Sequence, residues 1–382
     1  MRAAIVTDAW LAMRAAGRAA RSEIAFRRNL ASPALRGHTE ACDLPIEGRY
    51  IFSSERGVFS LRRDMLRKLT NIPAFGIAIA ADKIYLATWH GQESLVLEGS
   101  LPALLGGGDC RWRELYRVRY LTEAGRIHQI TTQGEALWLA NTARNTYTKI
   151  DRRTGAWLAN IGPFRCSFGH PILNDHNHVN SVFAQPNYLL FAAFKINRAS
   201  AFGVCGKGVI RLFSYPNMGV HDCIIAGEDF LFCDSYRLWE GDNGGVVVKN
   251  GTVCDQAYFD ANPAFFVRGI AGHGPEMVIG NSHVGDARER FRGRGALIVA
   301  KNDRVVHRID LPCAQVYDIL REDGTHFDRP PAATNFEAAS ALLERHLGPA
   351  VEEFSLRDAL SGERQKKFAA SDIGDVAEYL DA

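Results

Sequence analysis

The sequence lacks most of the short motifs that identify a function directly. It contains no G-x-S-x-G elbow, no P-loop and no H-E-x-x-H motif, which argues against the enzyme classes that these motifs mark. The formal net charge is only +2, so neither nucleic acid nor an anionic membrane is an expected partner. No apolar run approaches the roughly 18 residues that a membrane span requires, and we expect none.

The sequence also lacks closely spaced pairs of cysteines. The 8 cysteines are scattered and form no C-x-x-C pair, which argues against both a zinc ribbon and a disulfide framework. Residues 8–30 have apolar positions at helical spacing among several arginines, and we expect an amphipathic helix rather than a secretory signal. These features together predict a cytoplasmic protein.

An internal repeat is what the sequence does contain. The segment IHQITTQGEALWLANT (residues 127–142) recurs without a gap as VHDCIIAGEDFLFCDS (residues 220–235). Three weaker copies begin at Ala74, Val179 and Val267, and a partial copy begins at Val316. Each full copy has a short apolar strand, a turn and a second apolar strand, at intervals that suit the blades of a β-propeller.

The repeat predicts a six-bladed β-propeller over residues 48–327. The last copy has only its first strand, whereas residues 49–63 form a two-strand unit without an inner strand. We therefore expect a composite last blade that closes the ring and leaves no free sheet edge. Helical extensions are expected at residues 1–47 and 328–382, the latter with helices at 336–347 and 356–382.

The second residue of each copy should lie at one mouth of the central channel, because the innermost strand of each blade lines that channel. These residues are Phe75, His128, Asn180, His221, Arg268 and Tyr317. A second ring at the ends of the second strands comprises Thr88, Asn141, Ala193, Asp234 and Asn281. Recurrence of polar residues at equivalent positions is the pattern that most resembles a site.

Three histidines on consecutive blades suggest metal or acid–base chemistry. His128, His178 and His221 are candidate ligands of Zn, Fe or Mn, with further candidates in the loop at residues 174–177. His128 and His221 are also candidate catalytic proton carriers. Tyr317 could act as a general acid or orient the substrate.

The remaining candidates would bind a small-molecule substrate. Arg268 could hold a carboxylate or phosphate by bidentate hydrogen bonds. The other candidate substrate-binding residues are Asn180, Asn141, Asp234, Asn281 and Trp89. For the residues at the strand ends, the alternative is that their side chains cap turns. Four histidines outside the repeat pattern are expected at the surface: His38, His307, His326 and His346.

The H-x-N element at His178 and Asn180 and the V-H-D step at residues 220–222 resemble a family of uncharacterised bacterial β-propellers related to NHL and gluconolactonase propellers. The resemblance covers roughly residues 49–325 and implies a metal in the channel. Gluconolactonase-like propellers use Glu, Asn and Asp, whereas this chain has Phe75, His128, Asn180 and His221 near those positions. This departure argues against calcium and lactone hydrolysis. By residue type alone, the site is more similar to the transition-metal sites of oligogalacturonate lyases and carotenoid oxygenases.

Three functions are consistent with these residues. The first is a metal-dependent enzyme acting on a small polar or anionic molecule at the channel mouth, with hydrolase, lyase and oxygenase chemistry all open. The second is a non-catalytic module that binds a protein or glycan partner. The third is a site where Arg268 and the histidines bind a phosphorylated or carboxylated ligand without a metal. The oligomeric state is not indicated by the sequence.

Overall fold

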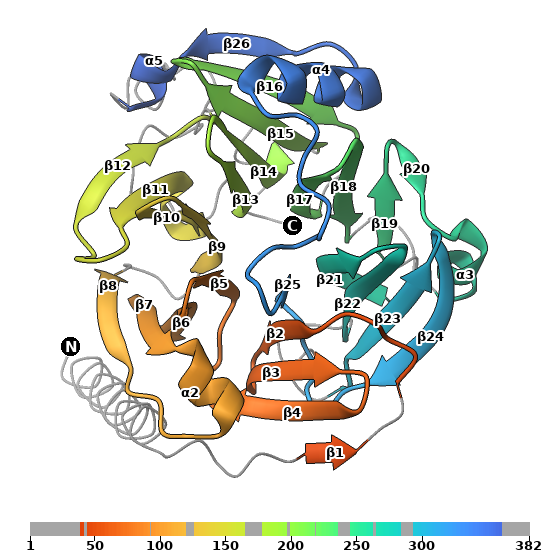
Figure 1. Cartoon of the computed structure of the whole chain (residues 1–382). Coiled ribbons are helices and arrows are strands. Elements are labelled where there is room, and N and C mark those ends of the chain that lie inside the picture. The colour runs from red at the N-terminus through yellow and green to blue at the C-terminus, as the bar shows by residue number, and fades with distance from the viewer. Residues whose placement is uncertain are drawn as a thin grey trace, which may run out of the picture.

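Six antiparallel sheets form a closed ring in the computed structural model of the chain (Figure 1). The structure describes residues 39–41, 44–91, 93–119, 126–164, 178–196, 199–217, 219–235, 245–262, 265–283 and 293–360. The sheets are arranged like blades around a central channel, which confirms the six-bladed β-propeller predicted from the repeat. The expected helix at residues 8–30 lies outside the described residues.

Each blade begins with the strand that lines the channel and continues outward. The first blade consists of β5 (Gly76–Ala80), β6 (Lys83–His90), β7 (Glu93–Ser100) and β8 (Arg113–Arg119). The second consists of β9 (Ile127–Gln133), β10 (Ala136–Asn141), β11 (Thr146–Asp151) and β12 (Trp157–Ile161). The third consists of β13 (Val179–Gln185), β14 (Tyr188–Ile196), β15 (Ala199–Gly206) and β16 (Val209–Tyr215).

The next two blades follow the same plan. The fourth consists of β17 (Val220–Ala226), β18 (Asp229–Asp234), β19 (Val246–Lys249) and β20 (Thr252–Val253). The fifth consists of β21 (Phe265–His273), β22 (Glu276–His283), β23 (Ala296–Lys301) and β24 (Arg304–Asp310). Side chains of the sheet faces pack between neighbouring blades, so each core cluster spans at least two of them.

The sixth blade combines the two ends of the ring. Its inner strand is β25 (Asp318–Arg321), which pairs antiparallel with β2 (Tyr50–Ser54). The blade continues outward through β3 (Gly57–Arg62), β4 (Met65–Thr70) and β1 (Thr39–Ala41). The pairing of β25 with β2 closes the ring. The inner strand of the sixth blade therefore has a hydrogen-bonded neighbour, as do those of the other five blades.

Short helices lie between the strands: α2 (Leu101–Gly106), a 3₁₀ turn η1 (Thr142–Arg144) and α3 (Gln256–Ala261). After the ring come α4 (Phe336–Leu347), β26 (Glu352–Ser355) and α5 (Leu356–Leu360). In α4 the Asn335 side chain accepts from the Ala338 amide, and Phe336, Ala339 and Leu343 are buried. No helix in the described part of the chain is long and apolar enough to cross a bilayer.

Each of the two terminal extensions contains a strand among its described residues. Residues 39–41 form β1 on the outer edge of β4, and residues 352–355 form β26 on the outer edge of β16. An outermost propeller strand has a row of unpaired backbone groups, and a short extended segment satisfies them. The expectation of purely helical extensions therefore needs correction at both places.

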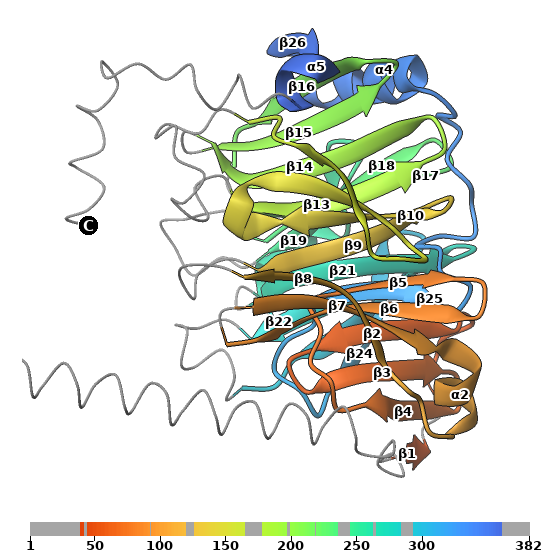
Figure 2. The ribbon, with the colours of Figure 1, turned by 90° about the vertical axis from the view of Figure 1, so that its left-hand side faces the viewer.

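The segment after β25 crosses the end of the channel where the inner strands finish. Figure 1 shows this strap (residues 322–335) passing close to the centre of the ring, and Figure 2 shows that it runs over one face. The carbonyl of His326 accepts a 2.7 Å hydrogen bond from the Gly272 amide. A Cβ on Gly272 would lie 2.4 Å from the Phe327 ring, so only glycine allows the strap to lie this close.

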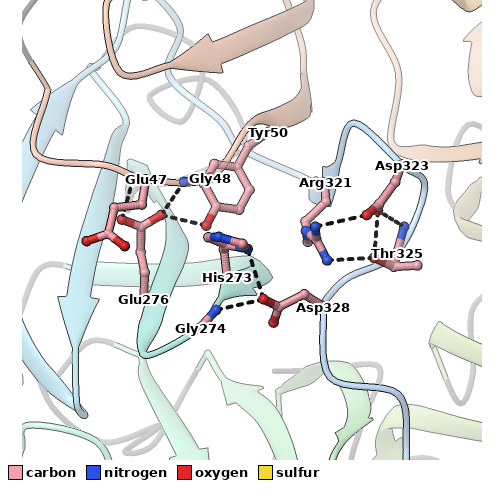
Figure 3. Close-up of polar contacts among 10 residues, drawn as sticks. All are labelled: Glu47, Gly48, Tyr50, His273, Gly274, Glu276, Arg321, Asp323, Thr325 and Asp328. Atoms are coloured by element: carbon pink, nitrogen blue, oxygen red, sulfur yellow. Dashed lines mark hydrogen bonds and ion pairs between the residues drawn. The ribbon is translucent and has the colours of Figure 1, made fainter.

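Polar contacts fix the strap to the fifth and sixth blades (Figure 3). Asp328 accepts from the Gly274 amide at 2.9 Å and lies 2.9 Å from Nδ1 of His273. The buried Glu276 carboxylate accepts from the backbone amides of Glu47 and Gly48 and from the Tyr50 hydroxyl, at 2.8, 3.1 and 2.7 Å. These contacts hold the strap and the fifth and sixth blades together at this end of the channel.

Candidate functional site

The start of the inner strand is irregular in four of the six blades. In β9 the pairing with β10 shifts so that both His128 and Gln129 stand opposite Ala140. Similar shifts occur in β13, β17 and β21. A β-bulge places an extra residue on one strand and changes the direction of the side chains around it. Consecutive residues at these positions therefore need not alternate between the two faces of the sheet.

Side chains next to these bulges form a continuous ring at the mouth where the inner strands begin. We call this set the mouth ring: Phe75, His128, His178, Phe194, His221, Phe266, Arg268 and Tyr317. Its members come from all six blades. The channel mouth is thus lined by ring faces, imidazoles and a guanidinium.

One half of the mouth ring is stacked tightly. The ring of Phe75 lies 4.5 Å from that of Tyr317 and 4.4 Å from that of Trp89, between centroids. On its other side Phe75 is nearly parallel to His128 at 5.0 Å. His178 meets His128 edge-on at 4.7 Å. Aromatic contacts of this kind hold rings in fixed orientations.

The other half is held by edge contacts and hydrogen bonds. Phe194 lies between His178 and His221, at centroid distances of 5.0 and 5.6 Å. His221 meets Phe266 at 5.6 Å, and its Nδ1 lies 2.8 Å from the Ser235 hydroxyl. These contacts fix the imidazole of His221 with its Nε2 buried and without a hydrogen-bond partner among the described residues.

Two of the three histidines are held in the neutral form. Burial lowers the pKa of His128 well below its ordinary value, and the charges of His178, Arg268 and Arg126 lower it further. Burial likewise lowers the pKa of His221, with Arg268 as the next cause. A neutral imidazole at pH 7 can accept a proton or coordinate a metal.

The structure does not gather the three candidate metal ligands around one point. In the described residues, no group of three or more His, Cys, Asp or Glu side chains is arranged to hold a metal ion. The reason is visible in the mouth ring, because Phe194 lies between His178 and His221. The additional candidates at residues 174–177 lie outside the described residues.

Arg268 and Tyr317, from neighbouring blades, lie close to each other. The guanidinium carbon of Arg268 is 4.5 Å from the Phe266 centroid and 5.9 Å from that of Tyr317. Both side chains are buried, with 9% and 8% of their surface exposed. Burial raises the pKa of Tyr317, so its hydroxyl remains a hydrogen-bond donor at any physiological pH.

The candidate substrate-binding amides and carboxylate make contacts within the fold. Asn180 donates to the carbonyl of Val220 on the next blade at 2.7 Å. Asp234 accepts from the Tyr215 hydroxyl at 2.8 Å. Asn141 lies 3.5 Å from the Thr148 hydroxyl at the end of β10.

Asn281 and Trp89 lie closer to the mouth ring. The Asn281 side chain accepts from the Phe266 amide at 3.2 Å, so it positions a ring of the site. Trp89 packs against Phe75 and under the guanidinium of Arg126, which lies 4.4 Å from the Trp89 centroid. Among the candidate substrate-binding residues, Trp89 thus has its ring in the wall of the mouth.

Sequence reasoning missed three wall residues and a second layer below them. Phe194 directly follows Ala193 of the second ring, whereas Phe266 and Arg126 each directly precede the first residue of a repeat copy. In the second layer, large and small residues alternate at the third position of the copies: Gly76, Gln129, Ser181, Asp222, Gly269 and Asp318. This alternation was a signal available in the sequence.

The second layer holds the bulge that carries Arg268. Asp222 accepts from the Gly269 amide at 2.7 Å and from the Gln129 amide side chain at 3.0 Å. Burial and the charge of Asp318 raise the pKa of Asp222 to about 7. The hydrogen bond from the Gly269 amide to Asp222 anchors the backbone directly after Arg268, where Gly269 has a φ of +75°.

One histidine expected at the surface lies inside the channel instead. His326 is only 8% exposed, and its Nε2 lies 3.8 Å from Oδ1 of the buried Asp318. The strap places it there when it folds back across the ring after β25. The repeat could not reveal this position, because His326 does not belong to any copy.

Several solved structures are similar to this chain at low sequence identity. A structure of a nidogen/laminin complex matches with a TM-score of 0.49 and 11% identity, covering 73% of this chain and 100% of that chain. A structure described as a putative 6-phosphogluconolactonase from Bacteroides fragilis matches with a TM-score of 0.44 and 12% identity, covering 74% and 99%. A protein of unknown function from Bacteroides caccae matches at 0.45 and 10%, covering 72% and 99%. No protein-family model and no curated protein matches the sequence.

Proposed function

We propose that the protein is an enzyme that acts on a small organic anion at the mouth ring, without a metal. The observation that carries this proposal is the closed ring itself, in which a buried guanidinium faces aromatic walls and neutral imidazoles. Sites for small molecules are typically concave and largely apolar, with a few polar groups that fix orientation. The mouth ring has this composition.

Arg268 provides the anion-binding group. A guanidinium presents donors in a planar fork that matches a carboxylate, and burial strengthens such a pair. Tyr317 lies beside it with a protonated hydroxyl, which can donate to the same anion. The phenyl rings of Phe75 and Phe266 would pack against the carbon skeleton.

The imidazole of His221 provides the proton acceptor. Its Nδ1 is oriented by Ser235, while its Nε2 is buried and has no hydrogen-bond partner among the described residues. A buried nitrogen without a partner is costly unless a ligand supplies a donor. An acidic O–H or C–H group next to the carboxylate could supply it, and His128 is a second neutral acceptor in the same wall.

Binding is tested first, on full-length protein treated with a chelator. A panel of small carboxylates is screened by thermal shift and calorimetry, since a ligand that binds only the native state raises the melting temperature. Arg268→Gln should raise Kd by about 10-fold or more, the value of a charged hydrogen bond. Arg304→Gln, at an exposed guanidinium of β24, is the matched control. If no carboxylate stabilises the protein, the proposal fails.

Catalysis is tested separately from binding. Proton transfer to His221 predicts deuterium exchange from solvent into the bound anion, or its conversion, followed by nuclear magnetic resonance. His221→Gln should slow this by about 100-fold or more while leaving Kd nearly unchanged. Binding without exchange or conversion would instead support the non-catalytic binding module.

The metal-dependent enzyme is the second candidate. It is favoured by the edge contact of His128 with His178 and by Nε2 of His221, which has no hydrogen-bond partner among the described residues. If Zn, Fe or Mn is bound, purified protein should contain stoichiometric metal by mass spectrometry, and His178→Ala should lose it. Full activity after complete removal of metal would exclude this candidate.

A further inference from the structure

Arg126 is a second guanidinium at the mouth, contributed by the residue before β9. Its guanidinium carbon lies 4.4 Å from the Trp89 centroid and 5.4 Å from the Phe75 centroid. Stacking of this kind keeps an arginine side chain flat against an aromatic wall. The sequence pattern does not single out this residue.

The backbone around Arg126 explains why the side chain leans toward the first blade. The Arg126 carbonyl accepts from the Thr142 amide at 3.1 Å, within its own blade. The next amide, of Ile127, donates across the blade boundary to the Ser94 hydroxyl at 3.4 Å. Arg126 is thus anchored at the junction of the two blades, next to the rings on which it stacks.

The two arginines lie over two rings that are in contact with each other. Arg126 lies over Phe75 and Arg268 lies over Tyr317, while Phe75 and Tyr317 are in contact at 4.5 Å. Both positive charges act on the same groups, because each lowers the pKa of Tyr317 and of His128. The two cations therefore act on the same part of the mouth.

We propose that the mouth ring selects anions with two separated negative charges, with one carboxylate on Arg268 and the other on Arg126. This inference rests on the proposed function and specifies its substrate class as a short dicarboxylate. The aromatic pair between the guanidiniums would cover the carbon chain that joins the two carboxylates. A monocarboxylate of the same length would bind Arg268 alone.

Calorimetry with matched probes tests this selection in the full-length protein. Dicarboxylates from malonate to adipate are compared with monocarboxylates of equal chain length. At least one dicarboxylate should bind about 20-fold or more tightly than its monocarboxylate partner, as expected for one more charged contact. Methyl phosphate is included as a compact dianion and should not show this advantage.

Variants of Arg126 separate charge from packing. Arg126→Gln should remove the advantage of the dicarboxylate and change the affinity for the monocarboxylate by less than about 3-fold, because only one contact is lost. Arg126→Lys, which keeps the charge but not the flat stack, should restore part of the advantage. Arg304→Gln should change neither affinity.

The outcomes distinguish this inference from the proposed function. If no carboxylate binds, the proposed function fails and this inference fails with it. Equal affinities for monocarboxylates and dicarboxylates would overturn only the two-charge selection. Tighter binding of methyl phosphate than of every dicarboxylate would also overturn it, as would an equal loss of both ligand classes in Arg126→Gln.

Discussion

The two ends of the channel are built from the same strands but differ in how their polar groups are used. At the end under the strap, Glu276, Asp328 and the carbonyl of His326 each accept from a specific backbone amide. At the other end, ring faces and guanidiniums predominate, and Nε2 of His221 has no hydrogen-bond partner among the described residues. The contacts under the strap join separate segments of the chain and so stabilise the fold. The opposite mouth brings together the cationic and aromatic groups that we propose bind an anion.

The largest expected effect is at the strap side. Glu276→Ala leaves two backbone amides and the Tyr50 hydroxyl without their acceptor, so we expect a loss of about 3 kcal/mol in the free energy of unfolding. Urea denaturation measures this loss, and anion affinity should be unchanged in the folded variant. Glu135→Ala, at an exposed carboxylate, should have almost no effect on either. Weakened anion binding in folded Glu276→Ala would break the division between the two ends.

A pH dependence should arise from the mouth ring. Because folding lowers the pKa of His221 below its ordinary value of 6.5, the unfolded chain binds the proton first. The contribution of His221 to the free energy of unfolding is therefore complete above pH 6.5. Below pH 6.5 the free energy of unfolding decreases, by up to about 1.4 kcal/mol per pH unit. Denaturation at a series of pH values should show a shallower slope for His221→Gln. The exposed His307, changed to Gln, is the control, and equal slopes in both variants would contradict the assignment.

A smaller effect is expected from the stacked half of the mouth ring. Phe75→Leu removes ring contacts to Trp89, His128 and Tyr317, for which we expect a loss of about 1 kcal/mol of stability. Anion affinity should fall as well, because Arg126 loses one of its two stacking surfaces. Calorimetry should detect both changes. Unchanged affinity would show that the stack is structural only.

The smallest effect is expected at the exposed edge of the strap. His273 and Asp328 are in contact, but 42% and 25% of their side-chain surfaces are exposed. His273→Gln should cost at most about 0.5 kcal/mol, as is usual for exposed ion pairs. A loss of more than about 2 kcal/mol would mean that this contact helps to hold the strap.

The sequence predicted the ring because the repeat marks the strands that line it. The apolar pattern of residues 127–142 and 220–235 fixes strand, turn and strand, and each copy then appears as the start of a blade. The helix at residues 336–347 was predicted with its observed bounds for a similar reason, since its periodicity is local. Features encoded in local pattern were predictable.

The details of the mouth were less predictable because they depend on contacts between blades. For example, the pairing of β13 with β14 shifts between Val179 and Ser181, so the regular alternation of a strand does not tell which face Asn180 lies on. The residue contacting both His178 and His221 is Phe194, which lies one position after Ala193 of the second ring. Neither the bulge nor the strap that buries His326 has a periodic signature.

The composite blade also has a consequence for how the protein is made. Tyr50–Ser54 emerges from the ribosome early, yet its partner on the channel side, Asp318–Arg321, is synthesised only after the other five blades. During that interval the edge of β2 has open hydrogen-bonding groups, and such edges invite pairing with other chains. The closing contact is also of very long range, which slows folding because a large loop must be closed first. Ring closure is thus both the last step of assembly and the point at which a nascent chain is most exposed to aggregation.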